Sequence, residues 1–137
     1  MSLFKKIRTW LQEPRLIGID PDSEEMLQIH SKVLYEKPMM REVFAEFYDT
    51  CIDLDNKYFM QTHSKRVEIG AGVSFFKKLY PEIISTDIKK ADNLDMVVDA
   101  QNMPFENNSV RAIYGINCFH HFPNPNLFFK ELERVLD

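Results

Sequence analysis

The spacing of hydrophobic residues predicts a helical segment at the start of the chain. Residues 3–12 place apolar side chains at helical spacing with lysines and an arginine between them, which describes a short basic amphipathic helix. A second helix, for which Asp22 or Ser23 can provide the N-cap, stops before Pro38, and a third begins at that proline. We therefore expect residues 1–65 to be mainly helical.

From Arg66 the pattern changes to short apolar runs, each followed by a glycine or a polar residue. The runs are 67–69, 83–86, 96–98 and 112–116, with helical stretches at 75–79 and 125–136. Continuous apolar runs are typical of parallel strands buried on both faces. Right-handed crossovers place the carboxyl ends of such strands at one edge of the sheet, where open α/β folds bind ligands. The pattern predicts an α/β fold.

Composition narrows the class of protein. The chain has 137 residues and 45% hydrophobic content, and its 17 basic residues are outnumbered by 21 acidic ones, evenly over both halves. This balance leaves no basic face for nucleic acid. Cys51 and Cys118 form no CxxC pair, and neither a signal peptide nor an uncharged stretch of membrane-spanning length is present. We expect a cytoplasmic protein that does not bind nucleic acid.

Two of the four glycines lie together at the end of the first predicted strand, in Gly70-Ala71-Gly72. Glycine permits a sharp turn and lets a ligand approach the backbone, although an ordinary strand-to-helix turn is an alternative interpretation. The dinucleotide fingerprint requires a third glycine where this chain has Phe75, and no Gly-Lys-Ser/Thr of a P-loop follows. NAD and P-loop nucleotides are therefore disfavoured.

Two aspartates end the next two predicted strands. Asp87 stands 17 residues after Gly70, where a carboxylate can accept hydrogen bonds from both hydroxyls of a ribose. Asp99 ends the third strand and can accept from an exocyclic amine. Either residue alone is also typical of an ordinary turn. Together with the glycines they favour a nucleoside ligand.

With these motifs, the chain from residue 66 to 137 resembles the class I S-adenosylmethionine-dependent methyltransferases, in particular the type 11 methyltransferase domain family. The resemblance is carried by VEIGAGVS at 67–74, STDI at 85–88, DAQNMPF at 99–105 and IYGINCFHHFP at 113–123. It implies a Rossmann-like three-layer sandwich with strand order 3-2-1-4. We expect an N-terminal helical cap at 1–65 and the front part of the S-adenosyl-L-methionine-binding domain at 66–137.

The resemblance also implies a set of cofactor-binding positions. These are Glu68, Gly70, Ala71, Gly72, Asp87, Ile88, Asp99, Ala100 and Asn117. Glu68 and the glycine turn would hold the methionine moiety, and the main chain near Asn117 would face its amino group. Asp87 would bind the ribose hydroxyls and Ile88 would pack on the adenine. Asp99 would accept from the adenine amine, and the Ala100 amide would meet a ring nitrogen.

Methyl transfer from a sulfonium is an in-line displacement that needs alignment and a deprotonated nucleophile. His120 and His121 follow the fourth predicted strand, where a substrate would approach, and either can act as the general base. Alternatively, both belong to the scaffold of the motif. No residue spacing suggests a metal site. The expected activity is methylation of a small-molecule or lipid-linked acceptor, and the alternative is a module that binds the cofactor without catalysis.

Two further expectations concern partners. The basic helix at 3–12 either docks on the domain or makes peripheral contact with a membrane surface that carries a lipid-linked substrate. The resemblance calls for further strands after Leu136, so we expect a C-terminally truncated domain whose fourth strand is an open edge. Such an edge can pair with a second copy to form a homodimer, unless the N-terminal helices close it.

Overall fold

The computed structural model describes residues 13–20, 23–59 and 64–137. The chain forms two compact units that divide between Arg41 and Glu42. The boundary lies inside the third predicted helix, so most of that helix belongs to the unit that contains the sheet. The predicted basic helix at 3–12 lies outside the described residues.

The N-terminal unit contains the short 3-10 helix η1 (Pro14–Leu16) and the helix α2 (Glu24–Glu36). Ser23 is the N-cap of α2, because its hydroxyl accepts a 3.1 Å hydrogen bond from the Met26 N–H. The helix α3 (Pro38–Tyr58) follows directly. Proline favours the first turn of a helix, and it disfavours helical backbone at the residue before it, so one helix ends and the next begins at Pro38. The second and third predicted helices are confirmed.

The second unit contains a four-stranded parallel sheet with the order β3-β2-β1-β4. The strands are β1 (Lys65–Glu68), β2 (Ile84–Asp87), β3 (Met96–Val97) and β4 (Val110–Tyr114). The predicted strand order is confirmed. The fourth strand begins and ends two residues earlier than the apolar run suggested: it begins where Val110 pairs with Lys65, and a turn follows in which Asn117 has a positive φ of 56°.

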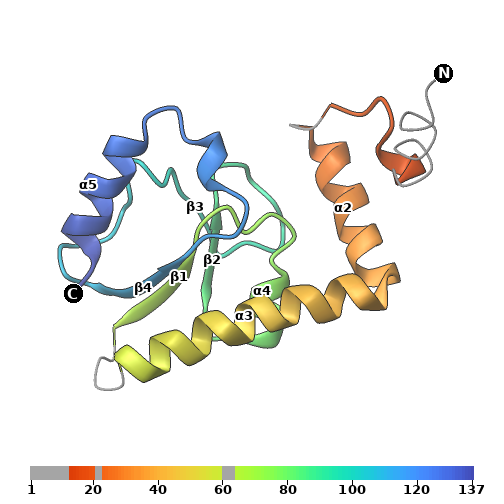
Figure 1. Cartoon of the computed structure of the whole chain (residues 1–137). Helices are drawn as coiled ribbons and strands as arrows, with labels where there is room; N and C mark the ends of the chain where they lie inside the picture. The colour runs from red at the N-terminus through yellow and green to blue at the C-terminus, as the bar shows by residue number, and fades with distance from the viewer. Residues whose placement is uncertain (1–12, 21–22, 60–63) are drawn as a thin grey trace, which may run out of the picture. The chain divides into compact units, whose positions relative to one another are not determined.

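Helices cover both faces of this sheet, as Figure 1 shows for the second unit. On one face, α5 (Pro125–Val135) buries Phe128 and Val135 in a cluster with Val67 of β1 and Val110 of β4. On the other face, α3 packs on the short helix α4 (Phe75–Leu79), and the Tyr48 ring stacks on Phe76 with centroids 4.1 Å apart. The three-layer Rossmann-like fold is confirmed.

A buried cluster of ion-paired side chains connects α3 to the sheet. The Asp55 carboxylate accepts hydrogen bonds from Arg66 at 2.7 Å and from Arg111 at 2.8 Å, and both the aspartate and Arg111 are buried. The pairing of β1 with β4 shifts register between Lys65 and Arg66, so that β4 carries one extra residue, Arg111. Such a bulge redirects a side chain, and here Arg111 faces Asp55.

The outer edge of β4 is partly occupied by the end of the chain itself. Val110 forms a parallel bridge with Leu136, and its carbonyl accepts a 3.1 Å hydrogen bond from the Asp137 N–H. Self-association through the rest of this edge, at 112–117, stays a prediction. Within the described residues, no helix has the length and apolar character needed to cross a membrane.

Candidate functional site

The turn after β1 requires its glycines. Gly70 and Gly72 have positive φ values of 62° and 51°, a region that favours glycine. A Cβ on Gly70 would lie 2.4 Å from the Cβ of Cys118, which is too close for any side chain. The segment after β4 thus packs directly against the glycine turn. Sequence reasoning placed these residues correctly at the end of β1, but it did not anticipate Cys118 as the reason for Gly70.

Glu68, the last residue of β1, carries the most perturbed carboxyl of the sheet unit. It is 3% exposed, and its Oε2 has no hydrogen-bond partner within the described part of the chain. Burial raises the pKa of Glu68 to about 8, the hydrogen bond with the Tyr48 hydroxyl opposes this shift, and the nearby Asp87 charge adds to it. A buried, unsatisfied carboxyl oxygen is costly without a ligand, so it marks a candidate binding group.

Asp87, at the end of β2, closes the glycine turn. Its Oδ2 accepts a 3.0 Å hydrogen bond from the Gly72 N–H, and its Oδ1 accepts one of 3.0 Å from the Lys89 N–H. The neighbouring Ile88 is 64% exposed, which leaves an apolar side chain available beside this carboxylate. Each carboxylate oxygen has a second lone pair, so these backbone contacts leave Asp87 able to accept from a ligand.

Asp99 and Ala100 follow β3. The Asp99 Oδ1 accepts a 2.8 Å hydrogen bond from the Gln101 N–H, which is the side-chain turn that aspartate commonly forms. Asp99 is exposed and Ala100 is buried. Because β3 pairs in parallel with β2, Asp99 lies at the same sheet edge as Asp87. Its role in binding stays a prediction, since the turn alone accounts for its observed contact.

The segment after β4 holds the two candidate bases. His120 and His121 lie in the 3-10 helix η2 (Phe119–His121), both exposed, with ring centroids 4.0 Å apart. Asn117 is exposed in the turn before them. Cys118 is buried and burial raises the pKa of its thiol, so it is a poor nucleophile. The exposed histidines are accessible to an acceptor, and their catalytic role stays a prediction.

Sequence analysis missed Tyr48 as a member of this site. It lies on the apolar stripe of α3, where a tyrosine is read as a core residue, and its ring does pack in the core. The Glu68 carboxyl nevertheless helps to raise the pKa of the Tyr48 phenol, after the larger effect of burial. Residues 48 and 68 are far apart in the sequence, so no local sequence pattern predicts that they lie near each other.

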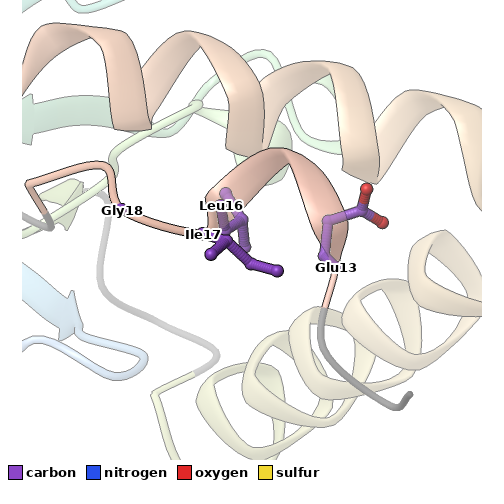
Figure 2. Close-up of a pocket in the computed structure, with 4 residues that line it drawn as sticks. All are labelled: Glu13, Leu16, Ile17 and Gly18. Atoms are coloured by element: carbon purple, nitrogen blue, oxygen red, sulfur yellow. The ribbon is translucent and has the colours of Figure 1, made fainter. Parts of the chain in front are cut away.

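A separate hollow lies in the N-terminal unit. Figure 2 shows the residues that line it, Glu13, Leu16, Ile17 and Gly18, around η1. Hydrogen bonds from Arg15 and Lys37 lower the pKa of Glu13 to about 2, so its carboxylate is already paired. None of the predicted site residues lines this hollow.

Comparisons with known proteins agree with this fold. A solved structure from Methanococcus maripaludis, provisionally assigned as an S-adenosyl-L-methionine-dependent methyltransferase, superposes with a TM-score of 0.56 at 14% sequence identity. The match covers 88% of this chain and 64% of that structure, so this chain spans less than two thirds of its length. No curated protein matches the sequence significantly. The family model of the methyltransferase domain, known as Methyltransf_11, matches residues 42–137, the unit that contains the sheet and α3 from Glu42 onward. The chain therefore belongs to the methyltransferase domain family.

Proposed function

We propose that this protein transfers a methyl group from S-adenosyl-L-methionine to a small-molecule or lipid-linked acceptor. One observation carries the proposal: the glycine turn after β1 lies between the Asp87 carboxylate, which accepts the Gly72 N–H, and the buried Glu68 carboxyl, whose Oε2 is unpartnered. Family membership supports the same activity. Neither the site geometry nor the family membership identifies the acceptor.

The residues present fit this cofactor. A nucleoside linked to an amino acid offers ribose hydroxyls, which donate, and an ammonium, which is cationic. Asp87 retains acceptor capacity for the hydroxyls, and the Glu68 carboxyl is an acceptor for the ammonium. The close approach of Cys118 to Gly70 leaves no room for a side chain at that position.

The cofactor, when bound, supplies an electrophilic methyl group and leaves as a neutral thioether. The chain aligns the acceptor and removes the proton that its nucleophile loses. His120 and His121 are the exposed side chains after β4 that we propose for this proton transfer. Because displacement depends chiefly on alignment, we expect the binding residues to matter more for the rate than either histidine.

Isothermal titration calorimetry of the purified chain with S-adenosylhomocysteine and with NAD tests the proposal. We expect binding of S-adenosylhomocysteine only, weakened in Asp87→Ala by about 1.5–3 kcal/mol, the usual value of hydrogen bonds to a charged group. The exposed Asp92, on the segment that follows the same strand, provides the matched control Asp92→Ala, which should bind like the wild type. NAD binding, or equal affinity in the Asp87 variant, would contradict the proposal. Binding without methylation of any acceptor would identify a non-catalytic module.

A further inference from the structure

A cluster of phenylalanine rings follows β4, at the candidate bases. Phe119 of η2 contacts three other rings of this cluster. Its ring centroid lies 5.7 Å from that of Phe122, and 6.1 Å and 5.8 Å from those of Phe128 and Phe129 in α5. Phe128 is buried, and Phe122 packs against the core of the sheet unit. The inner side of the cluster is therefore anchored in the core, and these edge-to-face and tilted contacts restrict the Phe119 ring.

The outer side of the cluster faces solvent. Phe119 is 49% exposed and Phe129 is 55% exposed, although each ring contacts the other. Single exposed apolar side chains are common on protein surfaces, but exposed rings in contact form a continuous apolar surface, which is a candidate interaction site. We call the exposed sides of Phe119 and Phe129 the aromatic face.

The aromatic face adjoins the candidate site through the chain itself. Cys118, which packs directly against Gly70 of the glycine turn, immediately precedes Phe119. His120 and His121 share the single turn of η2 with Phe119, and both are exposed. A ligand on the aromatic face is therefore next to the proposed bases and close to the turn that we expect to hold the cofactor.

The segment that carries the aromatic face disfavours a cationic ligand. Residues 119–130 include no acidic residue and one lysine, Lys130, in a chain with 21 acidic residues. The Asn124 N–H donates a 2.9 Å hydrogen bond to Gln101 Oε1, and the Asn124 side chain accepts one of 3.2 Å from the Asn126 N–H. These amides are thus engaged in local structure. The segment offers a cation no carboxylate, so it favours an uncharged ligand bound through its apolar surface.

We propose that the aromatic face binds the methyl acceptor, and that this acceptor is an uncharged aromatic molecule whose ring packs on Phe119 and Phe129 and carries the nucleophilic hydroxyl. This inference rests on the proposed function. Contacts between rings favour an aromatic acceptor over a saturated one of similar shape. An alkylamine is excluded as the acceptor, because it is a cation at neutral pH.

The same arrangement accounts for the proton. The acceptor oxygen gains the methyl carbon while that carbon leaves the sulfonium sulfur, whose positive charge is cancelled by the electron pair of the broken bond. The hydroxyl proton passes to His120 or His121, which lie beside Phe119 in η2. Phe119 is therefore a residue that determines acceptor specificity, and the histidines keep the role proposed above.

Binding of 2-naphthol to the full chain tests the aromatic face without cofactor or turnover. In an amide NMR titration, we expect saturable shift changes at Phe119 and Phe129. Phe119→Ala and Phe129→Ala should each weaken binding by roughly three- to tenfold, because each removes one ring contact. Phe119→Leu keeps an apolar side chain and the fold of η2, and it should weaken 2-naphthol binding as well. Decahydro-2-naphthol, the saturated analogue, should bind the wild type more weakly than 2-naphthol.

Phe47→Ala provides the matched control. Phe47 on α3 is 48% exposed, and its ring also contacts another phenylalanine, Phe44, at a centroid distance of 6.2 Å. The control should bind 2-naphthol like the wild type. Equal weakening in Phe47→Ala, or wild-type affinity in both Phe119 variants, would overturn the aromatic face. Tighter binding of the saturated analogue would overturn the aromatic acceptor and indicate an alkyl or lipid-linked one.

S-adenosylhomocysteine separates this inference from the proposed function. Both ligands should bind together, so saturating S-adenosylhomocysteine should leave the 2-naphthol shifts of Phe119 and Phe129 in place. Displacement of 2-naphthol would show that it occupies the cofactor site and would overturn the inference. Binding of S-adenosylhomocysteine without any binding of 2-naphthol would overturn the inference and leave the proposed function standing. Binding of 2-naphthol alone would overturn the proposed function and, with it, the role of the aromatic face in methyl transfer.

Discussion

Replacing Glu68 with glutamine should change how the stability of the protein depends on pH. The folded protein holds a proton on Glu68 up to a pKa of about 8, whereas the unfolded chain releases it near the usual value of 4.5. Between these values the folded state binds more protons than the unfolded state. Its stability therefore falls as pH rises from 4.5 to 8 and is constant above pH 8 with respect to this group.

The size of the effect follows from the shift. A change in pKa from 4.5 to about 8 corresponds to an upper limit of roughly 5 kcal/mol, at about 1.36 kcal/mol per unit. Because the side chain is only 3% exposed, solvent screening reduces this value little. Glutamine cannot ionise, so the variant loses this pH-dependent contribution. Its amide remains partly unsatisfied, which costs about 1–3 kcal/mol at every pH and shifts the whole curve without changing its slope.

Urea unfolding followed by circular dichroism, at half-unit steps from pH 4.5 to 8.5, measures this difference. The free energy of unfolding of Glu68→Gln minus that of the wild type should increase by several kcal/mol across the range, with equal m-values showing that the unfolded states are comparable. Parallel curves for the two proteins would refute the reasoning, because they would show that Glu68 has nearly the same pKa in the folded and unfolded states.

Three other substitutions test separate parts of the structure. Asp55→Asn should destabilise the fold by about 3–5 kcal/mol in urea unfolding, because it removes the carboxylate that accepts from the buried Arg111 and from the half-buried Arg66; a loss below 1 kcal/mol would contradict the buried cluster. Gly70→Ala should weaken S-adenosylhomocysteine binding at least tenfold by calorimetry, because its Cβ meets Cys118, and adding Cys118→Gly should restore part of the affinity; no restoration would exclude that clash. His120→Asn and His121→Asn should each preserve cofactor affinity, and a hundredfold loss of turnover in one of them would identify the base.

The positions of the strands could be predicted because each of them is a short apolar run that ends at a turn, whereas their order in the sheet was implied by the family resemblance. Burial on both faces removes the polar alternation, so the runs at 67–69 and 83–86 stand out from the surrounding helices. β3 is one residue shorter than its run, and Met96 and Val97 are exposed because the strand lies at the edge of the sheet. An edge strand is paired on one side only, and the apolar pattern does not distinguish an edge strand from a central one.

The candidate site was predictable only where its residues follow strands. Asp87 and the glycine turn belong to motifs within a few residues of a strand end, so their meeting follows from parallel pairing. The contacts of Tyr48 with Phe76 and of Arg111 with Asp55 depend on how α3 lies on the sheet and on a bulge in β4. Neither the angle of a helix nor the position of a bulge follows from hydrophobic spacing.

An amide NMR titration of the ¹⁵N-labelled chain with S-adenosylhomocysteine at pH 8.5 tests the central claim, that the carboxyl edge of the parallel sheet binds the cofactor. Saturable shift changes are expected for the amides of Gly70, Gly72, Ile88 and Ala100, which come from the ends of three different strands. The amide of Gly18, beside the hollow in the N-terminal unit, should not move. Changes confined to Gly18 and its neighbours, or no saturable change anywhere, would contradict the account.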